Sequence, residues 1–352
     1  HRYGGAAPAG PVSVLGPRAM SLLSVRSLSV RFPVLRSWWR ARALFVHAVD
    51  DVSFELAAGE TVGLVGESGC GKTTLGRAVV RLIEPTAGAI EFGGIDLASL
   101  RPGQLRPVRR RLQMIFQDPY GSLNPCLTVE QIIGEALDIH GLARTREALR
   151  ARVGFLLDHV GLAPADARRY PREFSGGQRQ RIGIARALAA EPQLIVCDEP
   201  VSALDVSVQA QIVNLLHDLQ REHGLAYLFI AHDLALIEHL SRRILVMYLG
   251  RVVEAGDTKM ICRTPAHPYT QALISAVPRL DPVANRRRIV LTGEVPSPIT
   301  PPSGCGFHPR CPIAEPRCGR EVPALREIAS GRWAACHLAW GGNRMATTGG
   351  VV

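Results

Sequence analysis

Alternating apolar and polar residues near the start of the chain predict β-strands. Residues 28–32 and 49–54 show this alternation and indicate an antiparallel strand layer. A continuous apolar run at 61–65 predicts a buried strand, because no position in it is suited to face water. The helices expected before residue 190 lie at 74–80, 129–140 and 147–160.

After residue 190 the pattern alternates between strands and helices. The predicted order is a strand at 194–197, a helix at 206–222, a strand at 226–231, a helix at 233–240 and a strand at 244–249. Strands that alternate with helices in this way pair in parallel, since each helix crosses over the sheet. From about residue 265 the chain is rich in proline and cysteine with weak periodicity, which predicts a boundary near 255–265.

The composition is that of a soluble globular protein, with 47% hydrophobic and 20% charged residues among 352. The longest apolar stretches, such as 244–249, are far shorter than the ~18 residues that cross a bilayer. The net charge of +10 comes from scattered basic residues, with denser groups at 36–42, 106–111 and 286–288. This distribution favours solvated faces over a membrane-proximal face, and it makes nucleic acid the least expected partner.

A glycine-rich motif follows the strand at 61–65. Residues 66–73 read Gly-Glu-Ser-Gly-Cys-Gly-Lys-Thr, the pattern of a phosphate-binding loop between a strand and a helix. Its backbone amides can wrap phosphate oxygens, Lys72 can reach the terminal phosphates, and the Thr73 hydroxyl can bind Mg²⁺. The residues expected to bind nucleotide here are Gly66, Glu67, Ser68, Gly69, Cys70, Gly71, Lys72, Thr73 and Thr74.

Two adjacent carboxylates, Asp198 and Glu199, end the apolar strand at 194–197. Carboxylates at the end of a strand can bind Mg²⁺ and activate water beside a bound triphosphate. Together with the phosphate-binding loop, they predict a nucleoside triphosphatase.

A second glycine motif precedes an alanine-rich helix. Residues 174–181 read Phe-Ser-Gly-Gly-Gln-Arg-Gln-Arg, and here the chain closely resembles the nucleotide-binding subunits of ABC transporters, with Phe174 in place of the family's leucine. The resemblance implies that Ser175, Gly176, Gly177 and Gln178 bind the γ-phosphate of ATP held by a partner subunit. Without the resemblance, the same residues read as a helix N-cap and turn.

The resemblance also assigns catalytic roles. Gln117 matches the glutamine that contacts Mg²⁺ or the attacking water, Asp198 matches the residue that binds Mg²⁺ through water, and Glu199 matches the general base. His232 matches the histidine that contacts the γ-phosphate, and Asp205 matches the aspartate at the subunit junction. The expected catalytic set is Lys72, Gln117, Glu199 and His232, which predicts a site competent for hydrolysis rather than a dead scaffold.

The aromatic residue that stacks on adenine is expected near residues 43–45. Phe45 is the preferred candidate and Trp39 the alternative, while an aromatic side chain at this point could equally belong to the core.

Four of the eight cysteines gather near the end of the chain, at Cys305, Cys311, Cys318 and Cys336. Four thiolates suit a [4Fe–4S] cluster, which is the preferred interpretation. They also suit a structural zinc ion, in which His308 or His337 could replace a thiolate. Thiols without a metal are the third possibility. The remaining cysteines are expected to be core or loop residues.

Residues 118–125, 265–273 and 304–312 narrow the resemblance to the oligopeptide/dipeptide branch of the ABC importers, in which the four cysteines are candidates for holding a [4Fe–4S] cluster. The branch implies an α/β fold with a P-loop NTPase core of ABC type, combining a parallel sheet and an antiparallel β layer. The expected parts are a disordered N-terminal extension at 1–21, an ATPase domain at 22–258 with a helical subdomain at about 118–190, a Cys-rich C-terminal extension at 259–340 and a disordered tail at 341–352.

The function implied is hydrolysis of ATP to power import of di- or oligopeptides. The implied partners are a second homologous ATPase subunit, two transmembrane permease subunits and an extracytoplasmic solute-binding protein, with this chain at the cytoplasmic face of the membrane. Import of nickel or an oligosaccharide, and a soluble ABC-type ATPase outside transport, are the alternatives. The latter class favours a long coiled-coil insertion or two tandem cassettes, and the sequence shows neither.

Overall fold

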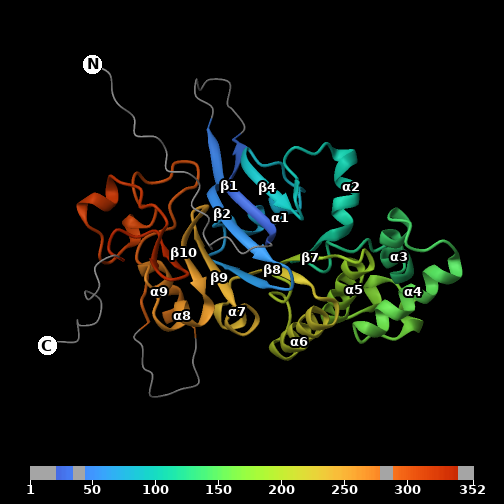
Figure 1. The fold of residues 1–352 in the computed structure, drawn as a ribbon. Coiled ribbons are helices and arrows are strands. Elements are labelled where there is room, and N and C mark those ends of the chain that lie inside the picture. The colour runs from blue at the N-terminus through green and yellow to red at the C-terminus, as the bar shows by residue number, and fades with distance from the viewer. Residues whose placement is uncertain (1–20, 35–43, 278–287, 340–352) are drawn as a thin grey trace.

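In the computed structural model, which describes residues 21–34, 44–277 and 288–339, the strands form two sheets (Figure 1). The smaller sheet is antiparallel and has the order β2-β1-β4-β5, which confirms the predicted antiparallel layer. Its strands are β1 (Ser21–Pro33), β2 (Phe45–Ala57), β4 (Ala87–Phe92) and β5 (Ile95–Asp96). Ser21 opens β1 rather than closing the predicted N-terminal extension, whose other residues and the tail at 341–352 lie outside the described residues.

The larger sheet has eight strands in the order β11-β12-β10-β9-β3-β8-β7-β6. Five neighbouring strands are parallel: β6 (Leu112–Ile115), β7 (Leu194–Asp198), β8 (Ala226–Ala231), β3 (Thr61–Val65) and β9 (Arg243–Tyr248). The other three are antiparallel and were not predicted: β10 (Arg251–Asp257), β11 (Arg326–Ala329) and β12 (Arg332–Ala334).

The central strands are mostly apolar because both faces of the sheet are covered. In β8, Tyr227 and Phe229 pack in one hydrophobic core, while Leu228 and Ile230 pack in the other. Successive strand residues point to opposite faces, so a strand buried on both sides has no position left for a polar side chain. The helices of this region are α1 (Lys72–Val79), α2 (Pro102–Arg111), α6 (Val206–His223) and α7 (Leu234–Leu240).

A group of helices stands to one side of the sheets (Figure 1). It contains α3 (Val129–Ile139), α4 (Arg146–His159), α5 (Gly176–Ala189) and the short 3₁₀ turns Pro164–Arg168 and Pro171–Glu173. Thr128 and Thr145 cap α3 and α4 by accepting bonds from backbone amides, which satisfies donors that the first helical turn leaves free. Among the described residues, no helix is both long and apolar enough to cross a membrane.

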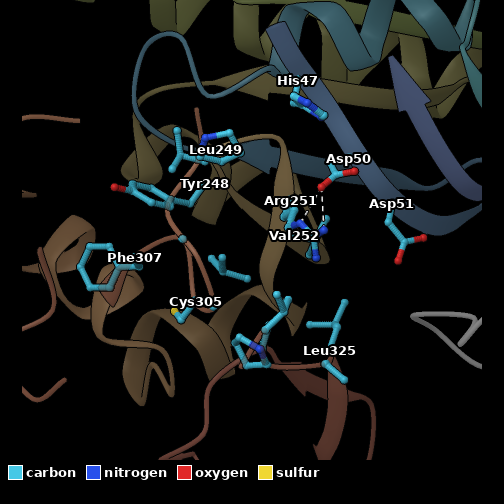
Figure 2. Close-up of a pocket in the computed structure, with 18 of the residues that line it drawn as sticks. His47, Asp50, Asp51, Tyr248, Leu249, Arg251, Val252, Cys305, Phe307 and Leu325 are labelled. Atoms are coloured by element: carbon cyan, nitrogen blue, oxygen red, sulfur yellow. Dashed lines mark hydrogen bonds and ion pairs between the residues drawn. The ribbon is translucent and has the colours of Figure 1, made fainter. Parts of the chain in front are cut away.

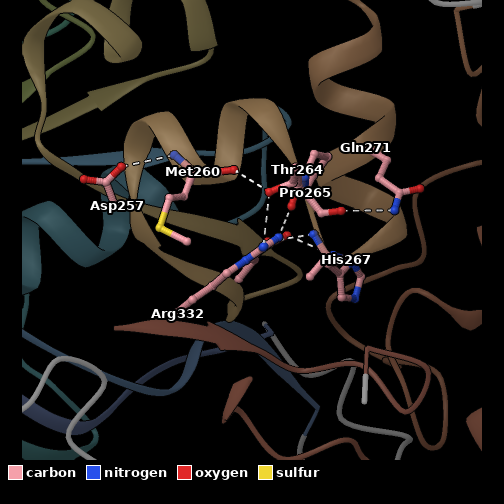
Figure 3. A network of polar contacts seen from close by, with 9 residues as sticks. Asp257, Met260, Thr264, Pro265, His267, Gln271 and Arg332 are labelled. Carbon is pink, nitrogen blue, oxygen red and sulfur yellow. Dashed lines mark hydrogen bonds and ion pairs between the residues drawn. The ribbon is translucent and has the colours of Figure 1, made fainter. Parts of the chain in front are cut away.

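The C-terminal segment is joined to the ATPase sheet rather than standing apart from it. It contributes α8 (Thr258–Arg263), α9 (Pro268–Ser275), the 3₁₀ turns His308–Arg310 and Pro316–Gly319, and the pair β11 and β12. Strand β12 pairs with β10, where Glu254 lies opposite Ala334. Figure 3 shows Arg332 of β12 reaching toward Thr264 and His267. The boundary expected near 255–265 is therefore crossed by strand pairing.

Candidate functional site

The glycine-rich loop joins β3 to α1 in the context that the motif requires. Gly71 has φ 105°, and a Cβ atom there would lie 2.0 Å from the Ala48 carbonyl oxygen, so only glycine fits. Gly69 has φ 79° and faces open space. The loop thus leads into the N-terminus of α1, whose first turn holds no acidic residue and whose free amides favour an anion.

Lys72 lies buried at the start of α1 and folds back over the loop. Its Nζ donates to the carbonyl oxygens of Gly66, at 2.8 Å, and Glu67, at 3.0 Å. The ammonium is therefore held inside the curve of the loop, where it can meet phosphate oxygens.

Thr73 and Asp198 form the second part of the site. The Thr73 hydroxyl donates to Asp198 Oδ1 at 2.8 Å, while Asp198 Oδ2 is buried and has no partner. Burial raises the pKa of Asp198, and the bond from Thr73 partly opposes that rise. A buried carboxylate oxygen without a partner, beside a hydroxyl oxygen, fits Mg²⁺, because this hard cation prefers oxygen ligands.

Three predicted catalytic residues meet at the carboxyl ends of β6, β7 and β8. Gln117 Nε2 donates to Glu199 Oε2 at 3.0 Å, and His232 Nδ1 lies 3.3 Å from the same oxygen. Glu199 has φ 45°, a strained conformation for a residue with a side chain, which turns its carboxylate toward the other two residues. Its side chain is only 14% exposed, whereas that of His232 is 58% exposed. This edge of a parallel sheet is where such folds bind ligands.

The second glycine motif caps α5. Ser175 Oγ accepts a bond from Gln178 N at 3.3 Å, and Gln178 Oε1 accepts one from Ser175 N at 3.0 Å. A Cβ atom on Gly177 would lie 2.5 Å from Val208, so α6 packs against the motif. Within the described part of the chain, no hydrogen bond or ion pair joins 175–178 to the loop at 66–74. The helix-cap reading is correct locally, and the exposed Ser175 stays available to another molecule.

Asp205 stands at the N-terminus of α6 and is exposed, and its side chain makes no capping bond. The next residue, Val206, is 82% exposed.

The adenine-stacking residue stays a prediction. Phe45 begins β2, pairs with Pro33 and is 40% exposed, so it is not a core residue. Trp39 lies outside the described residues.

The four C-terminal cysteines lie in one region. Cys305 N donates to Cys318 O at 2.7 Å, and Cys318 and Cys336 are close enough for their negative charge to add to burial in raising the pKa of Cys305. In the described ranges, however, no three of the sulfurs lie within 4.8 Å of one another. The only group of described residues that meets this separation is His159, Glu222 and His223, which the sequence did not indicate.

The two histidines considered as zinc ligands each engage a backbone carbonyl. His308 Nδ1 lies 2.8 Å from Cys305 O, and His337 Nε2 lies 3.0 Å from Glu321 O. Each ring keeps its other nitrogen, so these contacts fix the orientation of the imidazoles near the cysteines.

A cavity of about 780 Å³ lies away from the phosphate-binding loop, between β2, the turn from β9 to β10, and the C-terminal segment. Figure 2 shows His47, Asp50 and Arg251 on one side and Cys305, Phe307 and Leu325 on the other. Sequence reasoning missed this cavity, because its walls come from segments more than 250 residues apart, as with Asp50 and Cys305.

Comparison with known proteins agrees with this geometry. Residues 49–202 match the model of the ABC transporter family, and residues 253–318 match that of the oligopeptide/dipeptide transporter C-terminal region. A peptide ABC transporter ATP-binding protein of Sinorhizobium fredii is 54% identical over 90% of both chains. An oligopeptide transport ATP-binding protein of Bacillus subtilis is 51% identical over 90% of this chain and 97% of its own.

Among solved structures, the dimeric post-hydrolysis state of the ATP-binding cassette MJ0796, bound to ADP and Pi, is similar with a TM-score of 0.59 and 27% identity. The match covers 67% of this chain and 98% of that one. It leaves a third of this chain unmatched.

Proposed function

The chain belongs to the ATP-binding subunits of peptide ABC transporters, and from this membership we propose that it hydrolyses ATP to power the import of di- or oligopeptides. The observation that carries the proposal is the meeting of Gln117, Glu199 and His232 at the sheet edge that also bears Thr73 and Asp198. The match of residues 253–318 to the oligopeptide/dipeptide transporter C-terminal region favours peptide over nickel, oligosaccharide or a role outside transport.

Hydrolysis would proceed by positioning and charge neutralisation. The amides of the loop and the Lys72 ammonium hold the β- and γ-phosphates of ATP. Glu199 accepts a proton from the attacking water, while Gln117 and His232 orient that water and the γ-phosphate. Thr73 and Asp198 would hold Mg²⁺, which neutralises charge that develops on the phosphate oxygens.

The ATP site would be shared between two subunits. The motif at 175–178 is exposed at Ser175 and makes no bond to the loop of its own chain among the described residues, so it is free to meet ATP on a neighbour. The solved structure of MJ0796 is a dimer bound to ADP and Pi, which supports a shared ATP site here. The neighbour is a second, homologous ATPase subunit.

A groove beside the Gln117 segment would receive the permease subunits. It measures about 250 Å³ and is lined by residues of α3 and of the segments around Leu82 and Phe116. Leu82 and Ile139 are 52% and 45% exposed, and exposed apolar side chains around a groove favour a partner segment. One of the two transmembrane permeases would dock here, placing the chain at the cytoplasmic face, and an extracytoplasmic protein would deliver the solute.

The four C-terminal cysteines would hold a [4Fe–4S] cluster with a structural role. A single tetrahedral zinc ion needs sulfurs about 3.8 Å apart, given zinc–sulfur bonds of about 2.3 Å. The four thiols lie in one region, which supports a shared metal centre, while no three sulfurs lie within 4.8 Å of one another in the described ranges. Iron analysis and visible absorption test this proposal; a colourless protein with stoichiometric zinc would contradict it.

Substitution of Glu199→Gln tests the proposed function. In the complex reconstituted with its permeases, the variant is expected to bind ATP while phosphate release falls at least about a hundredfold, since a general base contributes on that order. The control is Glu191→Gln, which removes an exposed carboxylate that pairs with Arg110 and Arg152. Phosphate release by Glu199→Gln close to the wild-type rate would refute the assignment.

A further inference from the structure

Glu67 poses an electrostatic problem in the phosphate-binding loop. It is the second residue of the motif, and its carboxylate would repel a triphosphate bound by the same loop. The side chain is 26% exposed, so solvent screens the charge only in part. A cation close to this carboxylate would remove the repulsion.

The C-terminal segment supplies that cation. Arg310 Nη1 donates to Glu67 Oε2 at 2.8 Å, and Arg310 Nη2 donates to Glu67 Oε1 at 3.3 Å. The two residues are 243 positions apart in the chain, and the Arg310 side chain is only 8% exposed. Two parallel N–H···O bonds between a guanidinium and a carboxylate fix the direction of both groups as well as neutralising the charge.

The main chain of Glu67 is held as firmly as its side chain. Glu67 N donates to the Tyr269 hydroxyl at 2.7 Å, and Glu67 O accepts bonds from Lys72 Nζ, at 3.0 Å, and Cys70 N, at 3.3 Å. The C-terminal segment therefore meets the loop at two points, through Arg310 and through Tyr269 of α9.

Buried aromatic rings hold the guanidinium in place. Arg310 follows Phe307, which is 1% exposed and lies edge-on to Tyr248, with ring centroids 5.3 Å apart. Phe307 also packs against Tyr269 at 5.5 Å, and the Tyr248 hydroxyl lies 3.4 Å from Arg310 Nη1. Figure 2 shows Tyr248 and Phe307 side by side at the cavity wall. Rings packed in this way leave the backbone of Arg310 little freedom.

We propose that Arg310 is a positioning residue of the ATP site, which neutralises Glu67 and fixes the phosphate-binding loop in the form that accepts a triphosphate. The proposal rests on the proposed ATPase function and adds to it that the C-terminal segment completes the nucleotide site of its own chain. Arg310 touches no reacting atom, so its loss affects ATP affinity more than the chemical step.

The test compares Arg310→Ala, Arg310→Lys and the double variant Arg310→Ala/Glu67→Gln in the full-length chain, assembled with its partner subunits. Arg310→Ala is expected to raise the KM for ATP on the order of tenfold, the penalty for one uncompensated charge roughly 10 Å from the phosphates at an effective dielectric constant of about 20. Its kcat should change less than about twofold. Arg310→Lys keeps the charge and should lie between wild type and Arg310→Ala.

The double variant separates charge from folding. If the role of Arg310 is to neutralise Glu67, removing the carboxylate recovers most of the lost affinity; if Arg310 only stabilises the fold, the double variant stays as impaired as Arg310→Ala. The control is Arg26→Ala, because Arg26 makes an equally short but exposed pair with Glu91, at 2.8 Å in the antiparallel sheet. It should leave the KM unchanged.

Hydrogen exchange gives a readout independent of activity. Amides of residues 66–73 should exchange faster in Arg310→Ala than in wild type or Arg26→Ala, since the ion pair that holds Glu67 is lost. The positioning role alone is overturned if the wild type is active and the KM of Arg310→Ala lies within twofold of the wild-type KM. It is also overturned if the double variant does not recover affinity for ATP. A wild type that neither binds nor hydrolyses ATP overturns the proposed function and this inference together.

Discussion

Glu254 offers the sharpest test of how the C-terminal segment is fixed to the ATPase core. Its side chain is fully buried in β10, and its carboxylate accepts bonds from Ala266 N, at 2.8 Å, and His267 N, at 2.9 Å. Arg332 Nη2 of β12 lies 3.2 Å from the same carboxylate and also donates to Thr264 O. One side chain thus joins β10, β12 and the segment that leads into α9.

Glu254→Ala leaves a guanidinium and two amides without their acceptor in the interior. Breaking a buried ion pair by removing one partner costs about 3–5 kcal/mol of unfolding free energy. At roughly 2 °C per kcal/mol for a chain of this size, the melting temperature should fall by about 6–10 °C. Glu254→Gln keeps one acceptor oxygen and should lose less, because the shape and part of the bonding survive.

The matched control lies on the same strand. Arg251→Ala removes an ion pair with Asp50 at 2.6 Å, but the Arg251 side chain is 46% exposed. Exposed pairs contribute about 0–1 kcal/mol, so this variant should melt within about 2 °C of wild type. Thermal unfolding by circular dichroism measures the shifts, and limited proteolysis should release the segment after residue 257 earlier in Glu254→Ala. A Glu254→Ala loss no larger than that of Arg251→Ala would refute the reasoning.

Three further outcomes follow from the site. Asp198→Asn should stabilise the metal-free protein by about 1 kcal/mol, because a buried carboxylate with an unpaired oxygen is removed, and it should abolish Mg²⁺-dependent hydrolysis. Thermal unfolding without Mg²⁺ measures the stability and phosphate release with Mg²⁺ measures the activity. A destabilised metal-free variant would contradict the first expectation. Burial lowers the pKa of His267 to about 3 from its usual 6.5. As the pH falls below 6.5, the unfolded chain therefore binds a proton that the folded chain does not. The contribution of His267 to the free energy of unfolding is complete above about pH 6.5, and roughly 2 kcal/mol of it is lost between pH 6.5 and pH 5. His267→Asn keeps the cap that His267 Nδ1 gives to Tyr269 N and should flatten this slope; an unchanged slope in urea titrations excludes His267 as its source. Ser175→Asp retains the N-cap of α5 but adds a negative charge, so ATP-dependent association with the second subunit should be lost. The neutral cap of Ser175→Asn should retain this association, and size-exclusion chromatography compares the two variants. Equal behaviour of the two would show that no phosphate contacts this residue.

The elements that the sequence predicted well are those specified by local pattern. The predicted strand 226–231 coincides with β8, and the predicted helix 206–222 is one residue shorter than α6, because buried runs and helical periodicity are encoded within a few neighbouring residues. Strands β11 and β12 were missed for the opposite reason. They are three or four residues long and partly exposed. Strand β12 pairs with the edge of β10 and β11 pairs with β12, which no window around residues 326–334 reveals.

The residues at the sheet edge were predictable for a similar reason. Parallel strands end at a common edge, so Gln117, Glu199 and His232, each placed just after a strand, meet there even though they are 82 and 33 positions apart. Spacing along the chain therefore translated into proximity in space. The same logic does not place the cysteine sulfurs relative to one another, because the residues between them form turns rather than a periodic element.

At Glu67 the role predicted from the motif differs from the contacts in the structure. As the second residue of the phosphate-binding loop it counts as nucleotide-binding by position, yet its amide, carbonyl and carboxylate all engage the protein. Two of these partners, Tyr269 and Arg310, come from the segment that follows the ATPase core. A loop that binds an anion through backbone amides must be rigid before the anion arrives, because ordering it on binding would weaken affinity. The C-terminal segment supplies part of that rigidity, so its removal should weaken ATP binding even though it contributes none of the predicted phosphate-binding residues.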